Sequence, residues 1–251
     1  MIYFVGAGSG AADLITVRGA RLLREADAII YAGSLVSEEL LHERREGALV
    51  YNSAYMTLDE VIEVMVEMEK QQKMTVRLHT GDPSLYGAIR EQMDRLDELG
   101  FAYDICPGVS SFSAAAAALK AEYTLPSVSQ SVIITRMAGR TPVPELESIR
   151  RFAAHQCTMV IFLSASLTEK LQEELLEGGY QENTPVAIVY RASWPDEKII
   201  RCTVGTLHES ALHHEITRHA LIVVGDFLGD EYETSLLYDP AFSTGYREAK
   251  K

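Results

Sequence analysis

The sequence predicts an α/β protein made of two α/β domains, the first with a mostly parallel sheet and the second with a mixed sheet. Short apolar stretches alternate with helical stretches through the first half, which is typical of parallel strands joined by helical crossovers. In the second half, a short turn-rich connection joins the strands expected at 185–190 and 198–204, which favours an antiparallel hairpin. We expect domains at 1–121 and 122–229, a cleft between them, and a partly ordered tail at 230–251.

Composition and charge exclude several functional classes. The chain of 251 residues carries 23 basic and 36 acidic side chains, a net charge of −13, and so lacks the basic footprint that nucleic-acid binding requires. Its three cysteines have no paired spacing, which is typical of buried thiols in a reducing compartment. No apolar run reaches the roughly 18 residues of a membrane span. We expect a cytoplasmic protein with a small-molecule ligand and without nucleic-acid or membrane partners.

The first half supplies three strand–turn–helix units with glycine-rich turns. The expected strands are 2–5, 28–31, 74–78 and 102–105. One expected helix ends near residue 26, and three others cover 58–71, 85–99 and 112–119. Thr57 and Glu60 have capping-box spacing at the start of one helix. Ser84 is the expected N-cap of another, and Gly100 is its expected stop.

The second half begins after an aperiodic stretch near 122–129. Its expected strands are 131–135, 157–163, 185–190, 198–204 and 220–224, and its expected helices are 145–154, one opening at 166–169 with a second capping box, and 206–213. A loop at 136–144 carries Arg136 and Arg140.

The turns that follow the strands are the candidate site. They are 6–10, 81–84 and 107–111 in the first half, and 162–164, 191–193 and 224–225 in the second, and we expect all of them to approach one cleft. Such a site is made of main chain and small side chains, which suits a reaction that depends on placement more than on proton transfer. The first turn lacks the Gly-x-Gly-x-x-Gly spacing of a dinucleotide site, and no catalytic residue or metal pattern is assigned.

In these stretches the chain resembles the tetrapyrrole (corrin/porphyrin) methyltransferases, which use S-adenosylmethionine. The matching pieces are Val5–Gly10 with Asp13–Gly19, Gly81–Gly87, and Pro107–Ser111. Within that family the chain is most similar to the cobalt-precorrin-4/precorrin-4 C11-methyltransferases of cobalamin biosynthesis, on the basis of Tyr31–Val36, Thr135–Arg136 with Gly139–Pro144, and Tyr190–Glu197. Members usually have Pro and Asp-Pro where this chain has Ser9 and Ala11-Ala12, which predicts a looser first turn.

The resemblance implies a homodimer and an S-adenosylmethionine site. The implied donor contacts are Gly81, Asp82, Pro83, Tyr86, Ser110, Ser111, Phe162, Ala192 and Val224. Because the tetrapyrrole acceptor carries several carboxylates, we expect arginine forks near it. His79 is a candidate group that titrates near neutral pH and steers the macrocycle, and a loop histidine with its hydrogen bonds satisfied is the interpretation we favour over it. The candidate substrate contacts are Gly8, Gly10, Arg77, His79, Arg136, Arg140 and Arg191. For each of these arginines an ordinary surface ion pair is the competing interpretation.

Several other functions stay open at this point. A sibling methyltransferase would act on another tetrapyrrole position, on diphthamide or on ribosomal RNA, although the acidic balance disfavours RNA. A nicotinamide-dependent oxidoreductase and a tetrapyrrole carrier without catalysis are the alternatives from other classes.

Overall fold

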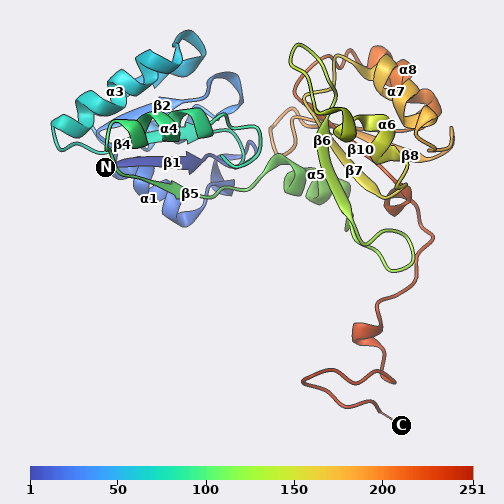
Figure 1. Ribbon diagram of the computed structural model, residues 1–251. Helices are drawn as coiled ribbons and strands as arrows, with labels where there is room; N and C mark the ends of the chain where they lie inside the picture. The colour runs from blue at the N-terminus through green and yellow to red at the C-terminus, as the bar shows by residue number, and fades with distance from the viewer. Residues whose placement is uncertain (251) are drawn as a thin grey trace. The chain divides into compact units, whose positions relative to one another are not determined.

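The chain folds into two compact units (Figure 1). The computed structural model describes residues 1–250, apart from the side chain of Ser34. The first unit comprises Met1–Ala115 together with Arg191–Glu197, and the second comprises 116–190 and the chain from Lys198 onward. The division falls inside helix α5 (Ser111–Leu119), before the boundary predicted after residue 121.

The first unit contains a five-stranded sheet in the order β3-β2-β4-β1-β5. Every pair in it is parallel, because each strand is followed by a helical crossover. The strands are β1 (Ile2–Gly6), β2 (Ala28–Tyr31), β3 (Leu49–Asn52), β4 (Thr75–His79) and β5 (Tyr103–Cys106). Strand β3 was not predicted, since it is a four-residue edge strand whose Leu49 and Val50 are exposed.

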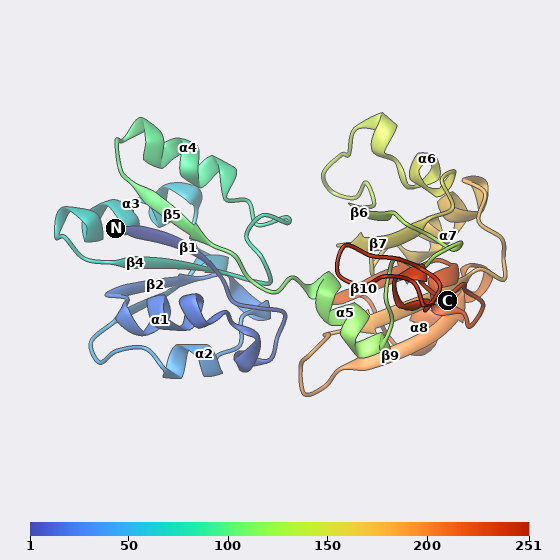
Figure 2. The ribbon, with the colours of Figure 1, turned by 90° about the horizontal axis from the view of Figure 1, so that it is seen from below.

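Helices cover both faces of this sheet (Figure 2). Leucines of α1 (Val17–Glu25) and α2 (Glu39–His42) pack on one face against Val5, Val76 and Leu78. Helices α3 (Leu58–Lys70) and α4 (Arg90–Glu98) pack on the other face against Ile2, Phe4 and Ile30. Because successive side chains of a strand point to opposite faces, each central strand contributes residues to two apolar cores, one on each face of the sheet.

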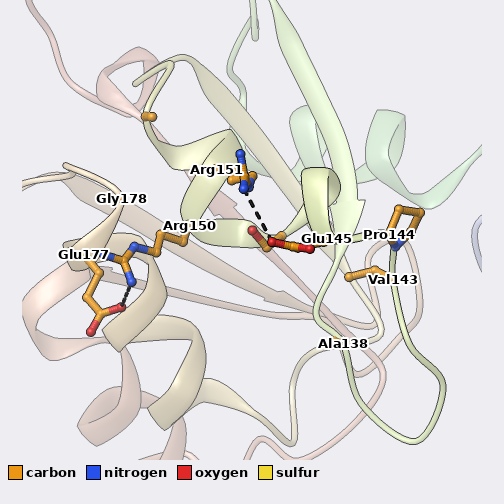
Figure 3. A pocket seen from close by; sticks show the side chains of 10 residues that line it. Ala138, Val143, Pro144, Glu145, Arg150, Arg151, Glu177 and Gly178 are labelled. Atoms are coloured by element: carbon orange, nitrogen blue, oxygen red, sulfur yellow. Dashed lines mark ion pairs between the residues drawn. The ribbon is translucent and has the colours of Figure 1, made fainter.

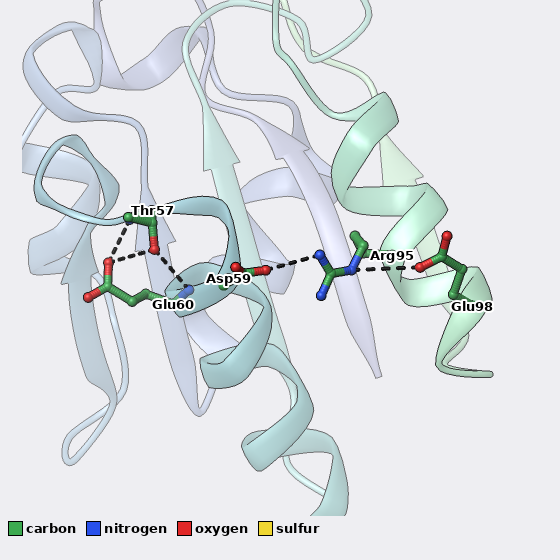
Figure 4. A network of polar contacts seen from close by, with 5 residues as sticks. All are labelled: Thr57, Asp59, Glu60, Arg95 and Glu98. Atoms are coloured by element: carbon green, nitrogen blue, oxygen red, sulfur yellow. Dashed lines mark hydrogen bonds and ion pairs between the residues drawn. The ribbon is translucent and has the colours of Figure 1, made fainter.

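The ends of α3 and α4 test two sequence predictions. The capping box is confirmed: Glu60 N–H donates to the Thr57 hydroxyl, and the Glu60 carboxylate accepts from Thr57 N–H (Figure 4). Arg95 of α4 pairs with Asp59 at 3.0 Å and with Glu98 at 3.7 Å, but these exposed ion pairs contribute little stability. The predicted start of α4 at residue 85 is wrong, because the helix begins at Arg90.

The second unit contains a mixed five-stranded sheet in the order β6-β7-β10-β8-β9, as predicted. Its strands are β6 (Val132–Arg136), β7 (Thr158–Phe162), β8 (Pro185–Tyr190), β9 (Lys198–Thr203) and β10 (Ala220–Val224). Strands β6 and β7 pair in parallel, the other neighbours are antiparallel, and β8 and β9 form the expected hairpin. One core joins the sheet to α6 (Ile149–Ala153), α7 (Thr168–Glu177) and α8 (Leu207–His213).

The predicted second capping box at 166–169 is wrong. The N-cap of α7 is Leu167, which makes no side-chain cap. Thr168 is already helical, and its hydroxyl hydrogen-bonds His208 Nδ1 at 2.9 Å instead of capping the helix.

The tail beyond Gly229 is mostly irregular and contains one short 3-10 turn, Leu236–Tyr238. Arg247 ties it together by donating to the carbonyl oxygens of Leu237, Asp239 and Phe242 at 2.6–3.3 Å. Across residues 1–250, no helix has the length and apolar character needed to cross a membrane.

Candidate functional site

Three turns of the first unit meet at the carboxyl edge of its parallel sheet. The turns after β1 and β4 exchange two main-chain hydrogen bonds between Gly8 and Gly81, at 2.8 and 3.3 Å. The turn after β5 packs against both. A Cβ on Gly108 would lie 2.2 Å from the Gly81 carbonyl oxygen and 2.7 Å from Gly6 Cα, which no side chain tolerates. The glycines are therefore needed for a close approach of three backbones.

Asp82 ties these turns together through its carboxylate. Its Oδ2 accepts from Gly108 N–H at 2.8 Å, and its Oδ1 accepts from the Ser84 N–H at 2.9 Å and from the Ser84 hydroxyl. Burial alone would raise the pKa of Asp82, but these hydrogen bonds outweigh it and lower the pKa below its ordinary value. Asp82 is therefore an anion at neutral pH. Ser84 is not the predicted N-cap of α4, since its hydroxyl is used on Asp82.

The segment between this turn and α4 has an unusual backbone. Tyr86 and Ala88 adopt left-handed φ angles of +56° and +50°, which non-glycine residues rarely take. A Cβ on Gly87 between them would lie 2.2 Å from the Pro83 carbonyl oxygen. The side chain of Tyr86 is 45% exposed. These left-handed residues explain why the predicted helix cannot start at 85.

The segment Arg191–Glu197, which connects β8 to β9, contacts the first glycine-rich turn. The Trp194 Nε1–H donates to the Ser9 carbonyl oxygen at 3.1 Å, and the Ser193 hydroxyl lies 2.9 Å from the Ser9 hydroxyl. A Cβ on Gly10 would lie 2.3 Å from the Trp194 ring. Ser193 also accepts from Ala11 N–H at 3.2 Å. Three hydrogen bonds therefore hold this turn, and a turn looser than that of other family members stays a prediction.

Sequence reasoning did not single out Trp194 as a site residue. The signal for it was a lone tryptophan in a turn-rich connection. Arg191 stacks on its ring at 4.3 Å and pairs with Asp196 at 2.9 Å. Trp194 also lines a hollow of about 600 Å³ beyond the ends of β2 and β3. That hollow is lined by Tyr31, Gly33, Val36, Ser37, Glu38, Glu39, His42, Asn52, Ala54, Tyr55 and Trp194.

Arg77 and His79 lie inside the first unit and not at its surface. They are 6% and 3% exposed and share one face of β4. Burial, and then the positive charge of Arg77, lower the pKa of His79 to about 3. The expectation that His79 titrates near neutral pH is therefore wrong. A direct contact of either residue with a substrate stays a prediction from the sequence.

In the second unit the expected turns divide between two edges of the sheet. Strand β10 runs antiparallel to β7 and β8, so Val224 pairs with Met159 near the start of β7. Phe162 stands at the opposite edge, where Ala220 pairs with Tyr190. The turns at 162–164 and 224–225, which were expected to approach one cleft, therefore lie at opposite edges of this sheet, and the direction of β10 places Ala220 at the edge of Phe162.

The arginines of the second unit differ in how they are used. Arg136 donates to the carbonyl oxygens of Met137, Thr141 and Pro142 at 2.7–3.2 Å and so shapes its own loop, whereas Arg140 is exposed. A hollow of about 580 Å³ beside α6 contains Arg150 and Arg151 (Figure 3). These pair with Glu177 at 3.1 Å and Glu145 at 3.6 Å, so each already has a carboxylate beside it.

The residues that the sequence predicts as donor contacts thus fall into groups. The first unit brings together Gly81, Asp82, Pro83, Tyr86, Ser110 and Ser111 along the turns after β4 and β5. Ala192 is buried in the segment that carries Trp194. Among residues 1–250, no group of three His, Cys, Asp or Glu side chains could hold a metal ion.

Comparison with known proteins identifies the family. The sequence model of the tetrapyrrole (corrin/porphyrin) methylases matches residues 1–208. A cobalt-precorrin-4 C(11)-methyltransferase of Methanocaldococcus jannaschii is 54% identical over 100% of this chain and 97% of its own. A precorrin-4 C(11)-methyltransferase of Mycobacterium tuberculosis is 44% identical over 96% of both chains.

Solved structures agree with the sequence comparison. The X-ray structure of a cobalamin biosynthetic enzyme, cobalt precorrin-4 methyltransferase CbiF, has a TM-score of 0.89 at 48% identity and covers 91% of this chain and 96% of its own. A uroporphyrin-III C-methyltransferase from Thermus thermophilus, complexed with S-adenosyl homocysteine, has a TM-score of 0.76 at 26% identity over 90% and 92%. The chain belongs to the tetrapyrrole (corrin/porphyrin) methylases.

Proposed function

We propose that the chain transfers the methyl group of S-adenosylmethionine to C11 of precorrin-4 or its cobalt form, a step of cobalamin biosynthesis. The observation that carries this proposal is the 54% identity, over the whole chain, to a relative named for that reaction. Precorrin-4 relatives at 44% identity and the fold of CbiF support it.

The donor would be held at the carboxyl edge of the first sheet. The close approach of Gly6, Gly81 and Gly108 leaves main-chain groups at this edge in place of long side chains, which suits an extended polar ligand. Asp82 keeps an anion there, which fits a donor that carries a positive sulfonium and an ammonium group. The complex of the Thermus relative with S-adenosyl homocysteine supports the same ligand class.

S-adenosylmethionine, when bound, supplies an electrophilic methyl group, so the reaction requires alignment more than proton transfer. In our proposal the turns at Gly81–Tyr86 and Ser110–Ser111 hold and orient the donor. From the second unit, Phe162 is the predicted contact, and Ala220 replaces Val224 because it stands at the same sheet edge as Phe162. Placement of this kind can supply about 7–11 kcal/mol of a barrier.

The acceptor's carboxylates would be bound by arginines, and Arg140 is the sharpest test. Arg140→Ala should raise the KM for the tetrapyrrole about tenfold and leave the Kd for S-adenosyl homocysteine unchanged. Arg150→Ala is the matched control, because Arg150 is also an exposed arginine of the second unit but pairs with Glu177. Equal KM values for the two variants would remove Arg140 from the substrate site.

The reaction is tested with methyl-labelled S-adenosylmethionine and two acceptors, precorrin-4 and uroporphyrinogen III. The expected product is precorrin-4 labelled at C11 only, located by NMR. Label at another ring position would establish a sibling activity, to which a Bacillus subtilis uroporphyrinogen-III C-methyltransferase at 30% identity points. The absence of any transfer would favour a carrier or an oxidoreductase.

The family resemblance also supports a cytoplasmic homodimer as part of this proposal. Analytical ultracentrifugation should give the mass of two chains, and a single-chain mass would remove that part without affecting the activity.

A further inference from the structure

Arg77 is a buried cation with neutral partners. Its Nε–H donates to the Gln92 carboxamide oxygen at 3.1 Å, and its Nη1–H donates to the Ile30 carbonyl oxygen at 3.1 Å. Burial lowers the pKa of Arg77 to about 10, so the guanidinium stays charged at neutral pH. Within the described chain it has no ion pair with a carboxylate, whereas buried charges usually have one. The contact with Gln92 is therefore a main constraint on this side chain.

Gln92 carries the contact further, to the loop before α4. Its side chain is buried, and its Nε2–H donates to the Ala88 carbonyl oxygen at 2.9 Å. A guanidinium can only donate and a carbonyl can only accept, so the orientation of the carboxamide is fixed by its two partners. No other side chain of this shape satisfies both: Glu has no donor for Ala88, and Leu or Met has neither group.

The loop that Gln92 holds is the strained part of the candidate donor site. Ala88 and Tyr86 are left-handed, and such residues persist only where surrounding contacts determine them. Tyr86 is partly exposed and lies two residues after the Gly81–Ser84 turn. A contact that fixes Ala88 therefore fixes the backbone on which the Tyr86 side chain depends.

We propose that Gln92, anchored by Arg77, is a positioning residue for the donor site, which it serves by holding Ala88 and Tyr86 in their left-handed conformations. This rests on the proposed function for the part that concerns S-adenosylmethionine. Arg77 then acts on the reaction from inside the sheet, through Gln92 and the loop.

The test is Gln92→Glu, which keeps the size of the side chain and forms an ion pair with Arg77. It removes the N–H that Ala88 accepts and places an anion against that carbonyl. We expect the Kd for S-adenosyl homocysteine, measured by calorimetry, to rise about tenfold. The KM for S-adenosylmethionine should rise with it, while kcat and the KM for the tetrapyrrole stay within about twofold. The matched control is Glu98→Gln, an exposed residue of the same helix.

A second variant separates positioning from general damage. Glycine adopts φ near +50° without strain, so Ala88→Gly in the Gln92→Glu background should bring the Kd back to within about threefold of the wild type. A Kd that Gln92→Glu leaves unchanged, or that Ala88→Gly does not restore, would overturn the proposal.

Hydrogen exchange tests the contacts from Arg77 through Gln92 to Ala88, which we call the relay, without any ligand. The peptide that covers 83–90 should exchange at least about tenfold faster in Gln92→Glu than in the wild type or Glu98→Gln. Unchanged exchange would overturn the relay itself. Wild-type protein that binds neither S-adenosyl homocysteine nor S-adenosylmethionine, but shows the expected exchange, would overturn the proposed function and leave the relay standing.

Discussion

The two sheets have five strands each, but their strand directions differ, and so does what each sheet places at its edges. In the first sheet all strands are parallel, so the turns after β1, β4 and β5 meet at one edge. In the second, β10 is antiparallel to β7 and β8, so the turns that follow these strands lie at opposite edges of the sheet. A parallel sheet concentrates its turns, whereas a mixed sheet distributes them.

The sheets also differ in what their central strands bury. Strand β4 of the first sheet buries Thr75, Arg77 and His79 on one face, and within residues 1–250 the Thr75 hydroxyl and His79 Nε2 have no hydrogen-bond partner. Strand β7 of the second sheet buries Thr158, whose hydroxyl donates to the Tyr123 carbonyl oxygen at 2.8 Å. Unpaired buried polar atoms cost stability, so we expect β4 to be the less favourable of the two strands in this respect.

The largest effect is expected where the first unit packs backbone on backbone. Gly108→Ala should lower the free energy of unfolding by more than about 3 kcal/mol, because the new methyl group would overlap Gly81 and Gly6. Gly139→Ala in the second unit should stay within about 0.5 kcal/mol, since its nearest neighbour is a leucine side chain at 3.4 Å. Urea unfolding measures both, and equal values would contradict the contrast between the units.

His79 makes the stability of the first unit depend on pH. The folded state binds the His79 proton only near pH 3, whereas the unfolded chain binds it near 6.5. The unfolded state therefore takes up the proton first, and stability falls as the pH drops from 6.5 toward 3. His79→Asn should reduce the loss between pH 7 and pH 4 by on the order of 3 kcal/mol.

The measurement uses Trp194, the only tryptophan of the chain, which belongs to the first unit. Its fluorescence reports urea unfolding at each pH. The same pH dependence in the variant and the wild type would show that His79 is not buried as a neutral ring.

The two units also differ in the side chains whose hydrogen bonds hold their turns, a carboxylate in the first and a hydroxyl in the second. Asp82→Asn should cost about 2 kcal/mol, because it removes charge-assisted hydrogen bonds to Gly108 and Ser84. Ser164→Ala in the second unit should cost about 1 kcal/mol, since it removes neutral bonds to Met137 and Phe162.

The hydrogen bonds of Asp82 should also depend on pH, whereas those of Ser164 should not. The pKa of Asp82 is lowered, so its stabilisation is present above its ordinary value of 3.8 and is lost as the pH falls below it. The Asp82→Asn variant should lack this part of the acid response. Melting temperatures measured between pH 6 and pH 3 test this expectation. The same pH dependence in the variant and the wild type would show that the Asp82 hydrogen bonds do not stabilise the fold.

The smallest effect is a difference in sign between two threonines at the starts of strands. Thr75→Val should raise stability by about 1 kcal/mol, because it removes a buried hydroxyl without a partner. Thr158→Val should lower stability by about 1 kcal/mol, because it removes the hydrogen bond that the Thr158 hydroxyl donates to the Tyr123 carbonyl oxygen. Urea midpoints that move in the same direction would show that burial alone decides both.

Local signals made most of the first unit predictable. Glycine, proline and the capping box at Thr57 mark turns and helix starts within a few residues, and the turns of a parallel sheet then meet without further information. Val224 was misplaced because the direction of β10 depends on pairing with β7 and β8, which are distant in sequence. Arg77 was expected as a substrate contact or a surface ion pair, because a charge in a strand gives no sign that its partners are a carboxamide and a carbonyl.

The grouping of Arg191–Glu197 with the first unit means that neither unit is one continuous piece of chain. A fragment that ends near Ala115 would carry the first glycine-rich turn without the indole and hydroxyl that rest on it. Chimaeras between relatives should therefore exchange 191–197 together with 1–115, and a crossover that separates them should yield poorly expressed protein.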